Sequence, residues 1–299
     1  MLKSIHILLS YTCTWECDHC FLYCGPDTEG TFTIGQIKSV LDEAVKIGTV
    51  SSVYFEGGEP FLYYPLMLAA IHEARVRNIE VGIVTNAYWA ITVDDARLWL
   101  APLVDYKISD LSISDDKFHQ ESDNNTAKNA RAAAKALRLP VGTICIDPPS
   151  VALSASIEHK KGEPVVGGGV MFKGRAADKL TTNLPRRPRA LFKECPHEDL
   201  IQPERVHIDC FGNVQLCQGI VLGNMWKTQL SRLISEYRAE NHPIAGPLTR
   251  GGPEALARMY GVDVGNEFVD ECHMCFLVRR VLVDRFPEYL APRHVYGIK

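Results

Sequence analysis

The sequence lacks the features that place a chain in a membrane or on a nucleic acid. No apolar run approaches the roughly 20 residues of a membrane-spanning helix. The short apolar N-terminus, MLKSIHILLSY, lacks the small-residue cleavage site of a signal peptide. The net charge of −4 and the isoelectric point near 6.2 give no positive excess for binding phosphates. We therefore expect a cytoplasmic protein with neither a membrane nor a nucleic-acid partner.

Repeats and low-complexity tracts are also missing, which excludes solenoid and disordered architectures. The 299 residues, 46% of them hydrophobic and 23% charged, suit one large globular domain or two moderate ones. Two short basic stretches, at 185–189 and 279–280, are expected to be a solvated loop and an exposed helix face.

Cysteine, by contrast, is abundant and unevenly placed. Ten cysteines form a front group at 13, 17, 20 and 24 and a back group at 195, 210, 217, 272 and 275. In a reducing cytosol such grouping indicates metal binding or catalysis rather than disulfides. Cys145 stands alone between two isoleucines and is expected to be a small core residue. The distribution predicts two metal sites.

The first 175 residues alternate β-rich runs with helical patterns. Thr33 and Gln36 form a capping box that starts a helix, and Gly48 suits its end. Further helices are expected over 65–78, 92–100 and 124–138, and a loop bordering the barrel mouth over 148–168. Strands are expected at 5–11, 51–58, 80–86, 105–114, 141–147 and 167–175. Six βα units predict an α/β fold with a partial (β/α)6 TIM-like barrel over 1–180.

The pattern changes after about residue 180. Residues 205–209 and the run VQLCQG flank a CFGN turn, which predicts a β-hairpin. Helices are expected near 228–238, 254–260 and 269–286. We predict a smaller second domain over 181–299, a β-hairpin plus helices, containing half of the cysteines.

The front group lies on the loop after the first strand, at the barrel edge where catalytic groups gather. Its spacing is Cys13-x3-Cys17-x2-Cys20, followed by Phe21. A structural zinc site normally combines a C-x2-C pair with a second pair from elsewhere. Three thiolates on one loop fit three corners of a cubane iron–sulfur cluster better, which leaves one iron open for chemistry.

These residues resemble the signature of radical S-adenosylmethionine (radical SAM) enzymes, and Gly57-Gly58-Glu59-Pro60 resembles the family's GGEP motif at the end of the second strand. Asn86 resembles the family's TN(G) position, although Ala87 replaces the usual glycine, and Lys173–Ala176 resembles its GRA motif. The resemblance implies that a [4Fe–4S] cluster and SAM yield a 5′-deoxyadenosyl radical that abstracts hydrogen from a substrate. It assigns the SAM contacts to Phe21, Gly57, Gly58, Glu59, Asn86, Ser112, Ser114 and Arg175.

The run SDDKFH offers the candidate substrate-binding side chains. Asp115, Asp116 and His119 could bind a metal or act as acid and base, whereas capping preferences make Asp115 a helix N-cap. We expect His119 to contact the substrate. Tyr88 and Trp89 either line the pocket or belong to the core.

The back group suits a four-cysteine site. The hairpin and the Cys272-x2-Cys275 pair resemble the auxiliary-cluster module of SPASM and twitch-type radical SAM enzymes, and the shorter twitch form is the better match. The resemblance implies a second [4Fe–4S] cluster, and zinc remains an alternative because it also accepts four thiolates. Cys210 is excluded because four ligands complete the site. The expected ligands are Cys195, Cys217, Cys272 and Cys275.

A closed second cluster favours electron transfer, and hence a net oxidation of the substrate. The substrate is either a small molecule or a peptide, with flavodoxin or ferredoxin as electron donor. Cys13 lies too near the start for a preceding leader-binding module, which favours the small molecule. A maturase acting on a peptide or protein partner, and a non-catalytic iron–sulfur or zinc protein, remain alternatives. Cys24 is expected to be a bystander or substrate-proximal thiol, and His19 to face away from the cluster.

Overall fold

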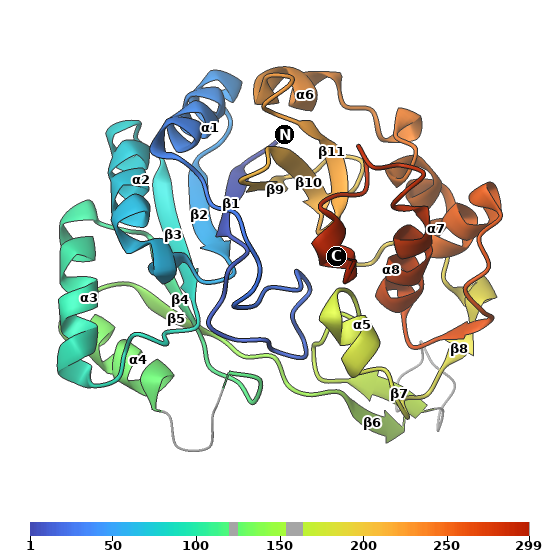
Figure 1. Cartoon of the computed structure of the whole chain (residues 1–299), viewed down its shortest axis with the longest axis horizontal. Coiled ribbons are helices and arrows are strands. Elements are labelled where there is room, and N and C mark those ends of the chain that lie inside the picture. The colour runs from blue at the N-terminus through green and yellow to red at the C-terminus, as the bar shows by residue number, and fades with distance from the viewer. Residues whose placement is uncertain (120–124, 154–163, 299) are drawn as a thin grey trace.

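The computed structural model describes residues 1–119, 125–153 and 164–298. Its centre is a curved sheet of parallel strands, with helices along the outer side (Figure 1). The strands are β1 (Ser4–Ser10), β2 (Ser52–Gly57), β3 (Glu80–Thr85), β4 (Asp110–Ser114) and β5 (Val141–Ile144). The helices are α1 (Ile34–Ile47), α2 (Tyr64–Val76), α3 (Val93–Tyr106) and α4 (Thr126–Ala136). This arrangement confirms the predicted α/β partial barrel.

Local sequence explains the first unit well. The Thr33 side chain accepts from the Gln36 backbone, Gln36 caps back, and Gly48 ends α1 in the left-handed region at φ 77°. Alternation in β1 buries Ile5, Ile7 and Leu9 under the helices and turns the intervening side chains towards the barrel interior.

The structure differs from the prediction at 167–175. Strand β7 (Pro164–Gly167) pairs antiparallel with β6 (Ser150–Leu153) in a ribbon separate from the main sheet. Gly168 and Gly169 then turn the chain at φ 116° and 83°, and the short helix α5 (Arg175–Lys179) follows. Residues 167–175 therefore do not form the predicted sixth parallel strand of the main sheet.

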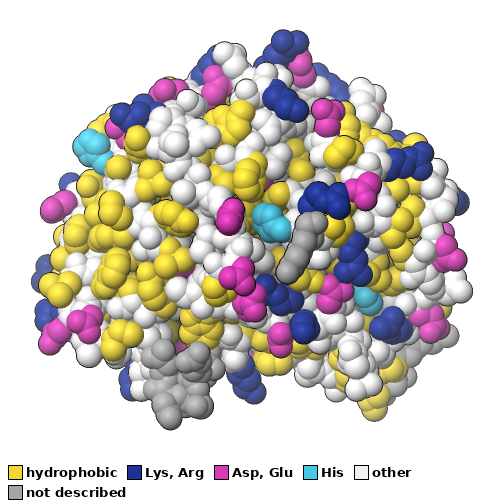
Figure 2. Space-filling model, viewed as in Figure 1, with side chains coloured by type: hydrophobic (Ala, Val, Ile, Leu, Met, Phe, Trp, Pro, Cys, Tyr) yellow, Lys and Arg dark blue, Asp and Glu magenta, His cyan; other side chains and the backbone are white. Residues whose placement is uncertain are grey.

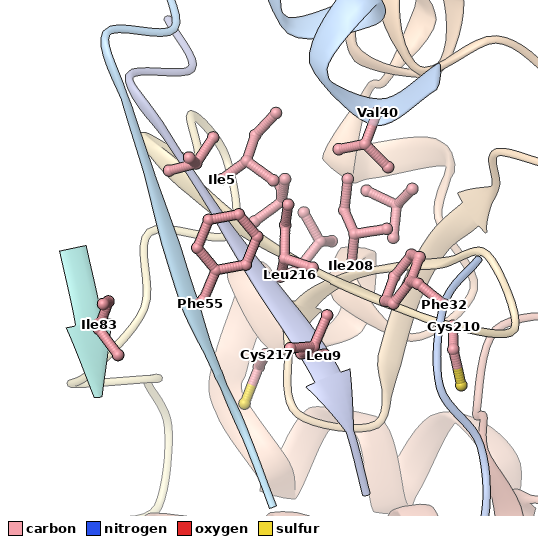
Figure 3. Close-up of a cluster of buried hydrophobic side chains, with 14 of the residues drawn as sticks. Ile5, Leu9, Phe32, Val40, Phe55, Ile83, Ile208, Cys210, Leu216 and Cys217 are labelled. Carbon is pink, nitrogen blue, oxygen red and sulfur yellow. The ribbon is translucent and has the colours of Figure 1, made fainter. Parts of the chain in front are cut away.

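The predicted hairpin forms and extends the same sheet. Strands β9 (Arg205–Asp209), β10 (Asn213–Cys217) and β11 (Ile220–Asn224) give the order β11-β10-β9-β1-β2-β3-β4-β5. Because β9 pairs parallel with β1, His207 lies opposite His6. Figure 3 shows the shared core, in which Ile208 and Leu216 pack with Phe55.

The remaining helices, short strands and turns complete the fold. They are α6 (Leu230–Glu236), α7 (Ala245–Tyr260), α8 (Glu271–Leu282), the paired strands β8 (Arg187–Pro188) and β12 (Glu267–Phe268), and short 3-10 turns at Pro60–Tyr63, Arg189–Leu191, Ala239–Asn241 and Arg293–Tyr296. Among the described residues, none of the helices is both long and apolar enough to span a bilayer. Acidic and basic side chains lie interspersed over the face drawn in Figure 2.

Candidate active site and second cysteine site

A cavity opens at the carboxyl ends of the parallel strands, where the loop after β1 meets the ends of β2, β3 and β4. Most of the predicted site residues line it together, while Glu59, Ser112 and Arg175 lie outside its lining. The lining includes Cys13, Cys17, Cys20, Phe21, Gly57, Gly58, Asn86, Ser114 and His119.

Gly57 and Gly58 bring the end of β2 against the loop that carries the cysteines. The backbone N–H of Gly58 donates to the Ser10 carbonyl at 2.7 Å. A Cβ on Gly58 would lie 2.0 Å from the carbonyl oxygen of Thr12, and Gly57 has φ 124°. Both positions therefore require glycine.

Glu59 holds the strand ends together rather than facing the cavity. One carboxylate oxygen accepts from the Phe61 backbone at 3.0 Å and from the Thr85 hydroxyl at 2.9 Å, and the other accepts from the Asn86 backbone at 2.8 Å. Burial raises the pKa of Glu59 to about 7.

Asn86 connects β3 to the cysteine loop. Its amide donates to the Thr14 hydroxyl at 3.1 Å and lies 3.6 Å from Cys13 Sγ. The next residue, Ala87, has φ 58°, a conformation in which glycine is strained least.

Cys13 and Cys24 are buried, Cys17 and Cys20 are partly buried, and the front thiols interact with one another. Burial raises the pKa of Cys13 to about 12 and also raises that of Cys17. A hydrogen bond with Cys24 lowers the pKa of Cys20 to about 6. Cys24 is thus a buried neighbour of Cys20 that lines the cavity. A cation among these thiols would stabilise their thiolate forms.

Arg175 has different partners from those expected. Its guanidinium donates to the carbonyls of Cys17 at 2.8 Å and Cys24 at 2.7 Å, and its backbone N–H donates to the Cys20 carbonyl at 2.8 Å. Gly174, at φ 61°, permits this approach, because a Cβ there would lie 2.5 Å from the backbone of Phe21. Arg175 therefore clamps the cysteine loop.

His119 lies at the cavity with a buried partner. Its Nδ1 is 2.8 Å from a carboxylate oxygen of Asp116, which is 4% exposed. His19, expected to face away, instead lines the same cavity, with ring centroids 5.1 Å from His119 and 4.4 Å from Phe118. Burial lowers the pKa of His19 to about 4.

Four side chains from the sequence interpretation lie away from the cavity. Ser112 donates to Asp110 at 2.8 Å. Asp115 pairs with Arg131 rather than capping α4, since Asn125 precedes that helix. Trp89 is a core residue, 3% exposed, and Cys145 is exposed, contrary to the expectation of a core residue.

Four of the five back cysteines lie together. Cys195, Cys217, Cys272 and Cys275 line one small cavity together with Lys173 and Arg279. Cys210 does not line that cavity; it is buried beside the β9–β10 turn. The structure thus brings together the four cysteines that the sequence singled out.

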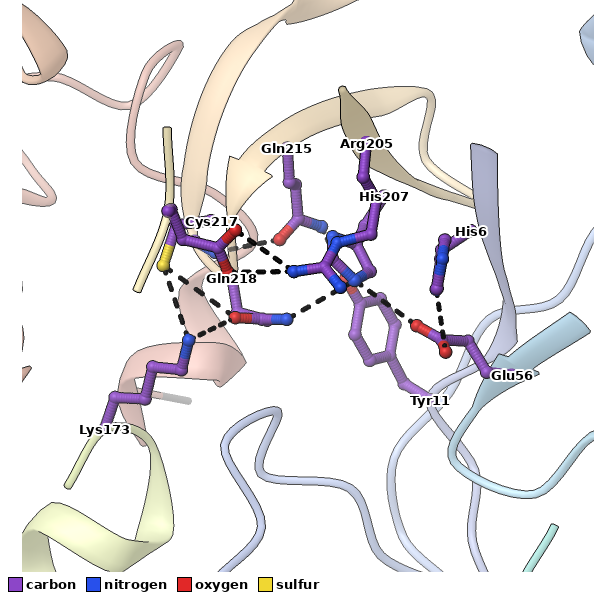
Figure 4. Close-up of polar contacts among 11 residues, drawn as sticks. His6, Tyr11, Glu56, Lys173, Arg205, His207, Gln215, Cys217 and Gln218 are labelled. Atoms are coloured by element: carbon purple, nitrogen blue, oxygen red, sulfur yellow. Dashed lines mark hydrogen bonds and ion pairs between the residues drawn. The ribbon is translucent and has the colours of Figure 1, made fainter. Parts of the chain in front are cut away.

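Two buried cations face these thiols. Lys173 Nζ lies 3.5 Å from Cys217 Sγ and donates to the Gln218 side-chain oxygen at 2.6 Å (Figure 4). Burial lowers the pKa of Lys173, but Cys217 and Cys272 raise it more, so it lies above its usual value. Arg279, expected on an exposed helix face, is 1% exposed and donates to the Gln218 carbonyl and to Tyr296. Neither cation forms an ion pair with a carboxylate of the described chain.

Sequence reasoning missed a third polar group. Among the described residues, two sets of three ligand atoms lie within 4.8 Å of one another: His6–Glu56–His207 and His19–Asp116–His119. Neither the front nor the back cysteines contribute a set of three sulfur atoms within 4.8 Å of one another. The alternation in IHILL and RVHID does place His6 and His207 on the strand faces opposite the core, but the pairing of β1 with β9 is a long-range contact.

Comparisons with known proteins match the front half of the chain. The radical SAM superfamily model matches residues 7–139. YydG of Bacillus subtilis (strain 168), named for peptide biosynthesis, is 23% identical over 39% of this chain and 37% of its own. An S-adenosylmethionine-dependent nucleotide dehydratase of Selenomonas ruminantium is 28% identical over 29% of this chain and 30% of its own. The chain thus spans about a third of the length of these relatives.

Solved structures share the fold over a longer stretch. BtrN in complex with AdoMet and 2-DOIA has a TM-score of 0.51 at 14% identity, over 78% of this chain and 82% of its own. Native anSMEcpe with bound AdoMet has a TM-score of 0.50 at 13% identity, over 96% of this chain and 97% of its own. Residues 7–139 therefore resemble a radical SAM domain, and the chain shares the fold of these two solved structures.

Proposed function

We propose that Cys13, Cys17 and Cys20 bind three irons of a [4Fe–4S] cluster whose fourth iron binds SAM. The observation that carries this proposal is the convergence of the three thiols with Gly57, Gly58 and Asn86 on one cavity. When bound, this cluster and SAM supply a 5′-deoxyadenosyl radical. Cys24 is not a ligand in this proposal, although it is buried beside Cys20.

The spacing of the cysteines supports a cluster over a single zinc ion at both sites. Thiolates about 2.3 Å from one tetrahedral zinc lie about 3.8 Å from one another. Neither cysteine group is among the described sets whose ligand atoms lie within 4.8 Å. A cubane separates its thiolates further because each binds a different iron.

The chain's own residues position the cofactor and substrate. Asn86 and Arg175 hold the cysteine loop from two sides, through Thr14 and through the carbonyls of Cys17 and Cys24. His119 keeps a proton on Nδ1 for Asp116, which leaves Nε2 to accept a proton from the substrate.

We propose that Cys195, Cys217, Cys272 and Cys275 hold an auxiliary [4Fe–4S] cluster. Its support is the charge balance: four thiolates on a 2+ core leave a net charge of about 2−, which the two buried cations Lys173 and Arg279 offset. When bound, such a cluster supplies an electron acceptor, consistent with a net oxidation of the substrate.

The substrate in this proposal is a small molecule, with a flavodoxin or ferredoxin as electron donor. A maturase that modifies a peptide or protein partner is the second candidate, favoured by the similarity to YydG. A non-catalytic iron–sulfur protein is the rival of another class.

Anaerobic reconstitution tests these alternatives. Reduction in the presence of SAM should release 5′-deoxyadenosine and methionine, and the chain should bind about eight irons for two cubanes. An electron carrier would release no 5′-deoxyadenosine. Replacing Cys272 by Ser should remove about four irons while 5′-deoxyadenosine formation persists.

A further inference from the structure

The barrel interior holds a compact set of ligand atoms that the radical chemistry leaves unused. His6 on β1 lies opposite His207 on β9 (Figure 4). Glu56 lies on β2, two residues after Tyr54, the residue that pairs with His6, and its side chain is therefore on the same face of the sheet. Glu56 carboxylate oxygens lie 3.0 Å from His6 Nδ1 and 3.4 Å from His207 Nε2. The three strands fix these side chains rigidly, since adjacent parallel strands present them on one face.

The neighbours of His207 determine how its ring is used. Lys173 only donates hydrogen bonds, so the Gln218 atom 2.6 Å from it must be the amide oxygen. The amide nitrogen of Gln218 therefore faces His207 Nε2, 3.5 Å away. An amide nitrogen only donates, which leaves His207 Nε2 without a proton.

This assignment creates a conflict that a cation resolves. An unprotonated His207 Nε2 and a Glu56 carboxylate oxygen face each other at 3.4 Å as two acceptors. A proton on Nε2 would instead oppose the amide hydrogens of Gln218. His207 Nδ1 is buried and has no partner among the described residues, so neither tautomer is satisfied by the protein alone.

We propose that His6, Glu56 and His207 bind one divalent transition-metal ion in the barrel interior. Two imidazoles and one carboxylate form a ligand set that first-row divalent ions accept with coordination positions left open. Glu56 also lines the cavity that contains the front cysteines, and the side chains of His6 and Glu56 are 15% and 18% exposed. Because Glu56 borders both the metal site and that cavity, an oxygen or nitrogen atom of the substrate is the expected further ligand.

Manganese binding tests the site directly, because Mn²⁺ prefers oxygen and imidazole ligands to thiolates. The anaerobically purified, iron-loaded protein is titrated with Mn²⁺, without SAM or reductant, and free Mn²⁺ is followed by EPR. One Mn²⁺ should bind per chain, and Glu56→Gln and His207→Gln should each raise the Kd at least tenfold. His72→Gln, at an exposed histidine, and His119→Gln, in the other His–Asp set, should leave the Kd within twofold.

Pulsed EPR on the wild-type protein gives a second readout that needs no variant. Bound Mn²⁺ should show couplings to two imidazole nitrogens. Absence of binding, absence of nitrogen coupling, or loss of binding in His119→Gln but not in Glu56→Gln would overturn the proposal. These measurements involve no radical chemistry, so a failure of the proposed enzymatic function would leave their outcome unchanged.

Discussion

Replacing Arg175 by Leu tests whether this side chain holds the cysteine loop. Arg175 is 8% exposed, and the substitution removes the two hydrogen bonds that its guanidinium donates to the carbonyls of Cys17 and Cys24 at 2.8 and 2.7 Å. Both carbonyls then lose a charged hydrogen-bond donor.

The magnitude follows from those two bonds. A hydrogen bond to a charged group contributes about 1.5–3 kcal/mol, so the loop should lose about 3 kcal/mol or more of local stability. Because about 1.4 kcal/mol corresponds to tenfold, amide hydrogens in residues 13–25 should exchange at least a hundredfold faster.

Hydrogen exchange of the cluster-free protein measures this loss, with urea unfolding as the global reference. Arg97→Leu is the matched control, since that guanidinium is 52% exposed and lies 4.0 Å from Asp94. Arg175→Lys keeps the charge without the two-pronged geometry and should give an intermediate rate. If the amide exchange rates of Arg175→Leu stayed within threefold of those of the wild type, Arg175 would not stabilise the cysteine loop.

Three further predictions concern groups whose burial is fixed by the fold. Glu59 has a pKa of about 7 in the folded state against 4.5 in the unfolded state. Its contribution to the free energy of unfolding is therefore full below pH 4.5 and is lost as the pH rises to 7. Between pH 4.5 and 7, the free energy of unfolding of the wild type should therefore fall by about 3 kcal/mol relative to that of Glu59→Gln, as measured by urea unfolding. The same pH dependence of stability in both proteins would contradict the raised pKa. Lys173→Met should lower the potential of the proposed second cluster by on the order of 100 mV in redox titrations, because it removes a positive charge 3.5 Å from Cys217 Sγ. An unchanged potential would place Lys173 away from the cluster. Cys24→Ala should retain the iron of the front site while Cys17→Ala loses it, and the reverse result would exchange their roles.

The sequence predicted local structure best. Thr33, Gln36 and Gly48 define the ends of α1 as the capping rules require. The prediction of a strand at 167–175 was wrong because this segment contains Gly168 and Gly169, whose positive φ angles turn the chain. Short apolar runs with glycine do not distinguish a strand from a turn.

The predicted site residues lie together where their spacing along the chain determines their positions. The front cysteines and Gly57–Gly58 are brought together by neighbouring strand ends, which the βα pattern already implies. Arg175 binds carbonyls of the cysteine loop, a contact that no residue pattern specifies. The pairing of β9 with β1, which joins His207 to His6, spans about 200 residues and depends on tertiary packing.

The central claim is that the front three-cysteine loop supports reductive cleavage of SAM. The most direct measurement is the amount of 5′-deoxyadenosine formed by the reconstituted, reduced protein with SAM, compared with Cys17→Ala. The account predicts 5′-deoxyadenosine from the wild-type protein and none from the variant. No 5′-deoxyadenosine from the wild type, or equal amounts from both, would contradict it.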